Sequence, residues 1–311
     1  MDFEARTSPI TQQKIAVVGL GRMGGNIARR LVACGLYLVR LYDNKTPVAQ
    51  SLSQELNVPV AQSLAEVTAQ AAVVITVVTD DAAMADIYTH PADNLLKNTD
   101  NALGTVFINC ATVSPDSHQQ INALTRHCGA AALELPMASS IPQAVSGTLF
   151  LMAAGKKVVF DYAAPLLDLL GETVIYTGET GTASTLKALL NMVMIINTAA
   201  LAEGLGLADA LGLDLKMVCD VFSKTGAHSR VLETDSQDMI NQDYETFFSA
   251  AHAAKDTNIA LKLGESTKLP LPLARVTAEL YQAMVDRGLG ELDKSGIAEL
   301  QFKTRPNKNS L

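Results

Sequence analysis

The sequence is poor in the residues that build metal sites, disulfide frameworks and nucleic-acid interfaces. Its four cysteines form no Cys-x-x-Cys pair, and its five histidines stand at no metal-ligand spacing. We therefore expect no metal, and a reduced, cytoplasmic protein. Acidic residues outnumber basic ones, 32 against 24, for a formal net charge of −8. That charge argues against a nucleic-acid or anionic-membrane partner, although a local basic pocket for a small anion stays compatible with it.

Targeting and membrane signals are also scarce. The N-terminal segment is polar, lacks the apolar core of a secretory signal, and contains Asp2 and Glu4, which disfavour an organellar transit peptide. The most apolar stretch, residues 189–202, is interrupted by Asn191 and Asn197. We therefore do not expect the chain to span a membrane.

Apolar residues are plentiful, at 48% of 311, and this length suggests two domains. Over residues 14–177, short runs of Val, Ile and Ala alternate with helical stretches, a pattern typical of a parallel sheet covered on both faces. We predict a doubly wound α/β sheet of the Rossmann type there, followed by an all-helical domain at 178–303. Residues 1–13 are expected to be a disordered leader and residues 304–311 a frayed polar tail.

One long helix is predicted to join the two domains. From about Ala183 the chain has no proline for some 25 to 30 residues, roughly 40 Å of helix, and it is apolar nearly all round. Lys187 and Asn191 stand four residues apart on one face, with Thr198 on the same side. Buried polar groups are costly unless something polar meets them, but a lysine reaching solvent beside a satisfied asparagine would give the same pattern.

A glycine-rich turn follows the first predicted strand. The strand at residues 14–18 leads into a Gly-x-Gly-x-x-Gly spacing, and a helix follows. In that context the pattern predicts a turn that binds the pyrophosphate of a dinucleotide, although a tight turn without a ligand is the alternative. The predicted cofactor-binding residues of this turn are Gly19, Leu20, Gly21, Arg22, Met23 and Gly24.

The second predicted strand ends at Asp43, about 20 residues beyond the glycines, where an acid accepts hydrogen bonds from the adenosine ribose. An acid at this place repels a 2′-phosphate, so we expect NAD(H), with Asn44 beside it. Lys45 weakens that preference and keeps NADP(H) as an alternative. A helix cap ahead of Pro47 would also explain Asp43.

Polar residues also follow the third and fourth predicted strands. They are Thr79 and Asp80 after one strand and Thr112 after the next. Because ligands bind at the carboxyl ends of the strands in doubly wound sheets, we assign these three residues to the cofactor site.

Four stretches in order resemble the β-hydroxyacid dehydrogenase family, and the resemblance covers nearly the whole chain after residue 13. GLGRMG at 19–24 is similar to the opening motif of the family. GETGTASTLKALLN, which ends at Asn191, is similar to its glycine-rich entry and Lys-x-x-x-Asn motif. KDTNIAL, with Lys255 and Asp256, is similar to its Lys-Asp motif, and LPLPLARVTAELYQAMVDRGLGELDKS is similar to its last motif.

The resemblance implies hydride transfer between a nicotinamide and the carbinol carbon of a small 3-hydroxy acid or semialdehyde. It implies that Lys187 is the general acid in reduction and the general base in oxidation, and that Asn191 orients the substrate. It places Lys255 near the nicotinamide and Thr112 near its ribose or carboxamide. A carbonyl that becomes an alkoxide does need a proton donor within about 3 Å. The family also implies a homodimer or homotetramer, and the apolar long helix suggests association through the helical domain.

One loop departs from the family pattern. Where the family reads roughly Asp-Ala-Pro-Val-Ser-Gly-Gly, this chain reads ELPMASS at 134–140. Ala138 stands in place of the serine, and Ser139 and Ser140 replace the glycines. The resemblance implies that this loop holds the substrate carboxylate, so we assign these three residues to substrate binding. The serines could supply replacement donors, the pocket could accept a different group, or the loop could be a tolerated variant.

Two other functions fit parts of the pattern. Imine reductases resemble this architecture, but they typically carry an aspartate or tyrosine where this chain has Lys187. A non-catalytic dinucleotide-binding protein would not require Lys187, Asn191 and Lys255 together.

Overall fold

The computed structural model describes residues 8–302. The chain divides into two compact units, Met1–Lys187 and Ala188–Leu311. The division lies inside the long helix α9 (Thr182–Ala210), so the first turns of α9 belong to the first unit and the remainder to the second.

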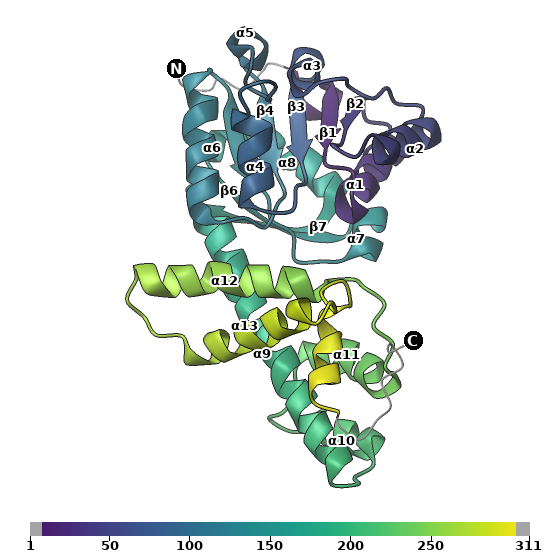
Figure 1. The fold of residues 1–311 in the computed structure, drawn as a ribbon. Helices are drawn as coiled ribbons and strands as arrows, with labels where there is room; N and C mark the ends of the chain where they lie inside the picture. The colour runs from purple at the N-terminus through teal and green to yellow at the C-terminus, as the bar shows by residue number, and fades with distance from the viewer. Residues whose placement is uncertain (1–7, 303–311) are drawn as a thin grey trace. The chain divides into compact units, whose positions relative to one another are not determined.

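The first unit is built on a seven-stranded sheet with the order β2-β1-β3-β4-β5-β6-β7. Strands β2, β1, β3 and β4 can be followed side by side in Figure 1. Strands β1 to β5 pair in parallel, and β1, β3, β4 and β5 are buried along their whole length, which explains their continuous apolar sequences. The strands are β1 (Ile15–Val18), β2 (Leu38–Tyr42), β3 (Val73–Thr76), β4 (Val106–Asn109), β5 (Ala131–Glu134), β6 (Leu149–Ala154) and β7 (Gly171–Gly178).

Helices cover both faces of this sheet. Along β1, Ile15 and Val17 pack into one apolar core, and Ala16 and Val18 pack into the other, because successive side chains of a strand point to opposite faces. The first core holds α1 (Arg22–Ala33), α2 (Thr46–Leu56), α7 (Ile141–Ser146) and α8 (Lys157–Leu170). The second holds α3 (Leu64–Gln70), α4 (Asp81–Thr89), α5 (Thr99–Ala102) and α6 (Pro115–His127). The predicted doubly wound fold is confirmed.

Strands β6 and β7 depart from the predicted parallel sheet. Glu134 at the end of β5 pairs with Ala154 at the end of β6 in antiparallel fashion, and β7 then pairs with β6 in parallel. A parallel connection needs a crossover that carries the chain back along the sheet. Between β5 and β6 the chain has only the six-residue helix α7, which is too short for that return.

The predicted leader is ordered where the structure describes it. Residues Ile10–Gln12 form the short 3₁₀ helix η1, and Ile10 is 1% exposed in the first core. The expectation of a disordered leader is therefore wrong for residues 8–13, because an apolar side chain fastens that segment to the sheet domain. The rest of the leader and the predicted tail at 304–311 lie outside the described residues.

Over the residues that the structure describes, the named elements of the second unit are all helices, as predicted. Ile195, Ala202 and Leu205 of α9 pack in one core with side chains of the helices that follow. By length and composition, α9 could cross a membrane, but that is weak evidence because core helices of soluble proteins share both features. The following elements are α10 (Leu215–Phe222), α11 (Arg230–Asn241), α12 (Ala250–Ser266), α13 (Pro272–Asp286) and the 3₁₀ helix η2 (Lys294–Leu300).

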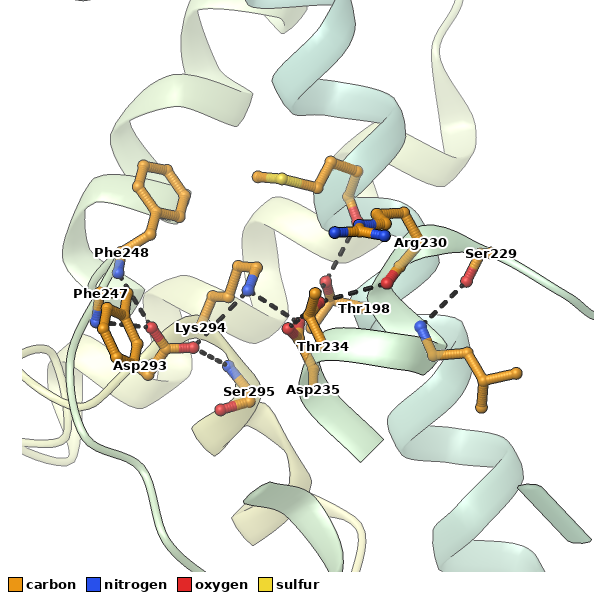
Figure 2. A network of polar contacts seen from close by, with 12 residues as sticks. Thr198, Ser229, Arg230, Thr234, Asp235, Phe247, Phe248, Asp293, Lys294 and Ser295 are labelled. Carbon is orange, nitrogen blue, oxygen red and sulfur yellow. Dashed lines mark hydrogen bonds and ion pairs between the residues drawn. The ribbon is translucent and has the colours of Figure 1, made fainter. Parts of the chain in front are cut away.

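A buried polar network joins the helices of this unit (Figure 2). The Lys294 ammonium lies 2.8 Å from Asp235 Oδ2 and 3.7 Å from Asp293 Oδ1. Asp293 Oδ2 also accepts the backbone N–H groups of Phe247 and Phe248, at 3.0 and 2.9 Å. The network therefore fastens α11, η2 and the segment before α12 to one another, and each buried charge has a partner of opposite sign.

Candidate active site

The turn between β1 and α1 contains three glycines, and the surroundings of each glycine differ. A Cβ on Gly19, whose φ is +85°, would lie 2.3 Å from the carbonyl oxygen of Val77. A Cβ on Gly24 would lie 1.8 Å from the carbonyl oxygen of Gly19, whereas a Cβ on Gly21 would meet nothing within 4 Å. The fold thus requires Gly19 and Gly24, while Gly21 leaves an open approach at the N-terminus of α1. A dinucleotide pyrophosphate fits that approach, because helix N–H groups favour anions.

Asp43 is held against this turn. Its Oδ2 accepts the backbone N–H of Leu20 at 2.7 Å, and its Oδ1 accepts the backbone N–H of Lys45 at 2.8 Å. The alternative of a helix cap is not supported, since Lys45 is the N-cap residue of α2. A carboxylate has lone pairs beyond these two bonds, so Asp43 can still accept ribose hydroxyls. Asn44 and Lys45 are exposed beside it.

The other strand-end residues lie along the same edge of the sheet. Thr79 and Asp80 follow β3, the neighbour of β1, and Thr112 follows β4. Asp80 is the N-cap of α4: its Oδ1 accepts the N–H of Ala83 at 2.9 Å, and Thr79 donates to its Oδ2 at 3.1 Å. Capping therefore accounts for Asp80, while the topology brings Thr79 and Thr112 to the edge that carries the glycine turn.

The two serines of the loop at 134–140, which departs from the family pattern, already take part in hydrogen bonds within the protein. Ser139 Oγ accepts the N–H of Phe150 at 2.9 Å, so its own proton stays available for another acceptor. Ser140 is the N-cap of α7, and its N–H and hydroxyl both donate to Gln143 Oε1, at 3.3 and 3.2 Å. The N–H of Ala138 donates to the carbonyl of Phe150 at 2.9 Å. Of the two hydroxyls, that of Ser139 is therefore better placed to serve a substrate.

Lys187 and Asn191 lie one turn apart on α9, so they share a face of the helix. Lys187 is 8% exposed and Asn191 is 1% exposed. Asn191 Nδ2 donates to Asp256 Oδ2 at 2.6 Å, and Asp256 Oδ1 lies 2.8 Å from the ammonium of Lys255. A carboxylate can only accept hydrogen bonds, so the NH₂ group of Asn191 must point toward Asp256, and this contact fixes the orientation of the amide. Asn191 Oδ1 accepts no hydrogen bond from any residue between 8 and 302.

The structure brings these residues together in two groups. The first unit gathers the glycine turn, Asp43, Thr79 and Thr112 at the carboxyl edge of its sheet. The second unit links Asn191 to Lys255 through Asp256. Sequence reasoning assigned no role to Asp256 beyond its place in a motif, and it missed Glu134. That acid ends β5, is 2% exposed, and accepts the N–H groups of Gly181 and Ser184.

A doubly wound sheet with an open glycine turn and an acid after its second strand defines a dinucleotide-binding protein. The family model described as the NAD binding domain of 6-phosphogluconate dehydrogenase matches residues 14–178, more than half of the chain. The model described as NAD-binding of NADP-dependent 3-hydroxyisobutyrate dehydrogenase matches residues 181–301. The chain belongs to the β-hydroxyacid dehydrogenase family and is an NAD(P)-dependent oxidoreductase that acts on CH–OH groups.

Relatives carry names that agree with this class. Glyoxylate/succinic semialdehyde reductase 2 of Arabidopsis thaliana is 28% identical over 298 residues, which cover 94% of this chain and 82% of that protein. The structure of 3-hydroxyisobutyrate dehydrogenase from Mycobacterium tuberculosis with L-serine is 28% identical, with a TM-score of 0.83, and the match covers 93% of this chain and 99% of that one. An imine reductase from Myxococcus stipitatus is 18% identical over 93% of this chain and 99% of that one, with a TM-score of 0.63, and shares the fold alone.

The glycine turn gives a matched pair of variants. In Gly21→Ala the new methyl group enters open space, so the free energy of unfolding should change by no more than about 1 kcal/mol. The methyl group would nevertheless occupy the approach to the pyrophosphate, so the Kd for NADH or NADPH should rise by about tenfold or more. In Gly24→Ala the clash with Gly19 should destabilise the fold itself by about 1–3 kcal/mol. Thermal unfolding and cofactor fluorescence titrations measure both quantities, and unchanged cofactor affinity in Gly21→Ala would place the cofactor elsewhere.

Proposed function

We propose that the chain interconverts a small 3-hydroxy acid and its semialdehyde, with Lys187 as the general acid–base and Asn191 as the residue that orients the substrate. A bound nicotinamide cofactor supplies or accepts the hydride at the carbinol carbon. In reduction, the Lys187 ammonium donates a proton to the carbonyl oxygen as the carbon gains hydride, which leaves a hydroxyl group and a neutral amine. In oxidation, the neutral amine accepts that proton again.

The observation that carries this proposal is the pair of polar side chains on an apolar helix. Lys187 and Asn191 are both more than nine-tenths buried, and burying such groups costs free energy unless polar partners meet them. Asn191 Oδ1 is a buried acceptor with no hydrogen bond from the described residues, and its orientation is fixed by Asp256. An acceptor of this kind suits the hydroxyl group of a hydroxy acid.

We propose that the substrate bears a carboxylate and that Ser139 helps to hold it. The Ser139 hydroxyl keeps a proton to donate, because its oxygen already accepts the N–H of Phe150. Names of relatives support a short substrate, since one is a glyoxylate/succinic semialdehyde reductase and another is a 3-hydroxyisobutyrate dehydrogenase determined with L-serine.

Replacing Lys187 tests the proton-transfer role. In Lys187→Met the side chain keeps much of its volume in an apolar helix but loses the titratable amine. We expect kcat with glyoxylate or succinic semialdehyde to fall by about 10²–10⁴-fold, while the Kd for the cofactor stays within about twofold. The loss of cofactor absorbance in the near ultraviolet measures turnover.

The control for this experiment is Lys224→Met, since Lys224 is an exposed lysine of the second unit. Equal activity of Lys187→Met and Lys224→Met would contradict the assigned role. A cyclic imine is included in the panel, and turnover of the imine without turnover of any carboxylate-bearing aldehyde would contradict the proposed substrate class.

We propose that NAD(H) is preferred over NADP(H). Asp43 stands at the end of β2, and its carboxylate is tied to the glycine turn through the N–H of Leu20, where its charge would repel a 2′-phosphate. Wild-type protein should therefore show a higher kcat/KM with NADH than with NADPH. Asp43→Asn keeps the shape of the side chain and should lower that ratio by about tenfold. Asp168→Asn, at an exposed position of α8, is the control, and a ratio that does not respond to Asp43→Asn would shift the preference to other residues.

We propose that a second copy of the chain covers an apolar surface of the helical unit. Leu207 near the end of α9 and Leu211 directly after it are 63% and 68% exposed, and Met217 and Val221 of α10 are 45% and 50% exposed. Two exposed apolar pairs at four-residue spacing are typical of an interface between helices. Sedimentation velocity at micromolar concentration should give a dimer or tetramer, and Leu211→Glu should give a monomer. The matched control is Leu103→Glu in the first unit, and a monomeric wild type would refute the proposal.

We also propose that the protein is located in the cytoplasm. All four cysteines carry free thiols in the structure, and burial raises the pKa of the Cys110 thiol to about 12, which makes it a poor nucleophile. Free thiols are typical of a reducing compartment. Subcellular fractionation tests the proposal, and recovery in an oxidising compartment would oppose it.

A further inference from the structure

The carboxylate of Glu134 reaches from the end of β5 to the start of α9. Its Oε1 accepts the backbone N–H of Gly181, and its Oε2 accepts the backbone N–H of Ser184 at 2.9 Å. Glu134 is 2% exposed and Ser184 is also 2% exposed, so both bonds are shielded from water. Both oxygens act as acceptors, which is the behaviour of an ionised carboxylate.

The start of α9 needs such a partner from outside the helix. The first N–H groups of any helix have no partner within it, and a Ser, Thr, Asp or Asn before the helix normally supplies one. Gly181 precedes α9 and has no side chain; its φ is +102°, and a Cβ there would lie 2.9 Å from Gln119 Nε2. A glycine is therefore required at the position that usually caps a helix, and Glu134 supplies the cap from a different strand. A negative charge at a helix N-terminus is favourable.

The charge of Glu134 is not balanced by a neighbouring imidazolium. The nearby titratable side chain on α6 is His118, which is 2% exposed. Burial lowers the pKa of His118, and Glu134, the backbone of Ala111 and Asp81 act in the opposite direction. With the first of these causes the largest, the imidazole is neutral at neutral pH. The two N–H groups and the N-terminus of α9 are then the groups that stabilise the carboxylate.

Two parts of the candidate site depend on this one side chain. Lys187 lies three residues beyond Ser184, so both residues occupy the same face of α9 within one turn. The loop that carries Ser139 leaves β5 directly after Glu134. Its Ala138 packs against an apolar cluster formed by Met152 and Ala154 of β6 and by Ala183 in the first turn of α9. The bonds from Glu134 and this apolar contact fasten the loop and the helix to each other.

We propose that Glu134 is a positioning residue for the reaction: its buried carboxylate caps α9 and thereby fixes Lys187 relative to the substrate loop. The inference rests on the proposed role of Lys187. It assigns Glu134 no contact with substrate or cofactor. Loss of the cap should loosen the first turn of α9 and misplace Lys187, while the glycine turn after β1 stays intact.

Glu134→Gln tests the cap with almost no change in volume. The amide has one acceptor oxygen, and its NH₂ group would face an N–H donor of Gly181 or Ser184. We expect kcat to fall by about 10- to 100-fold, because a displacement of about 1 Å can cost a factor of this size. The Kd for NADH should stay within about twofold, and amide hydrogen exchange over residues 181–187 should become at least about tenfold faster.

Two further variants keep the test decisive. Glu179→Gln removes an exposed carboxylate two residues before Gly181 without removing a bond to α9, so it should leave kcat and exchange unchanged. Glu134→Asp keeps the charge and both acceptors on a shorter side chain, so it should recover part of the lost kcat and part of the protection. It also serves as the working variant if Glu134→Gln does not fold.

The outcomes separate this inference from the function on which it rests. If Glu134→Gln matches Glu179→Gln in kcat and in exchange, or if its kcat falls only in proportion to the folded fraction, the positioning role is refuted. If exchange becomes faster while kcat does not change, Glu134 caps the helix but does not position Lys187, which also refutes it. If Lys187→Met retains full turnover, the proposed function fails, whatever the exchange data for Glu134→Gln show.

Discussion

A buried charge or polar group must find a partner, because removing it from water costs several kcal/mol. This requirement organises both units of the protein. In the helical unit, the ammonium of Lys294 lies between the carboxylates of Asp235 and Asp293, and it joins elements that are far apart in the sequence. In the sheet unit, the carboxylate of Glu134 meets the N-terminus of α9. In each case the polar contact fixes a geometry that apolar packing would leave less defined.

The same requirement distinguishes the structural polar groups from those of the candidate site. The partners of Asp80 and Ser140 are backbone or side-chain groups of the helices that they cap, so their roles are explained by the fold. Asn191 differs from them. Its amide nitrogen is satisfied by Asp256, while its oxygen is buried without a hydrogen bond from the described residues. An unsatisfied acceptor in the interior costs free energy, so packing and capping within the described residues do not explain this oxygen as they explain Asp80 and Ser140.

Much of the fold followed from local patterns in the sequence, and what did not follow depended on distant contacts. Runs of Val, Ile and Ala predict the buried strands. The spacing of three glycines between a strand and a helix predicts the glycine turn. The reversed direction of β6 depends on the short length of α7, which apolar periodicity does not measure. The order of residues 8–13 depends on one isoleucine that packs on a domain assembled from later residues. The sequence did not predict that Glu134 caps α9, because its partners Gly181 and Ser184 lie 47 and 50 residues further along the chain.

The departing loop can now be interpreted in the same physical terms. Its two serines place side chains where the family pattern has glycines, and both hydroxyl oxygens already take part in hydrogen bonds within the described residues. Ser140 is committed to the cap of α7, and the oxygen of Ser139 is committed to Phe150. What the loop can still offer a carboxylate is the Ser139 proton, on a segment that Ala138 and the first turn of α9 hold in place. Under the proposed role of Lys187, a substrate that this loop holds with few donors would depend more on Lys187 for its orientation. The cap that we propose for Glu134 on the first turn of α9 would then also fix the group on which that orientation depends.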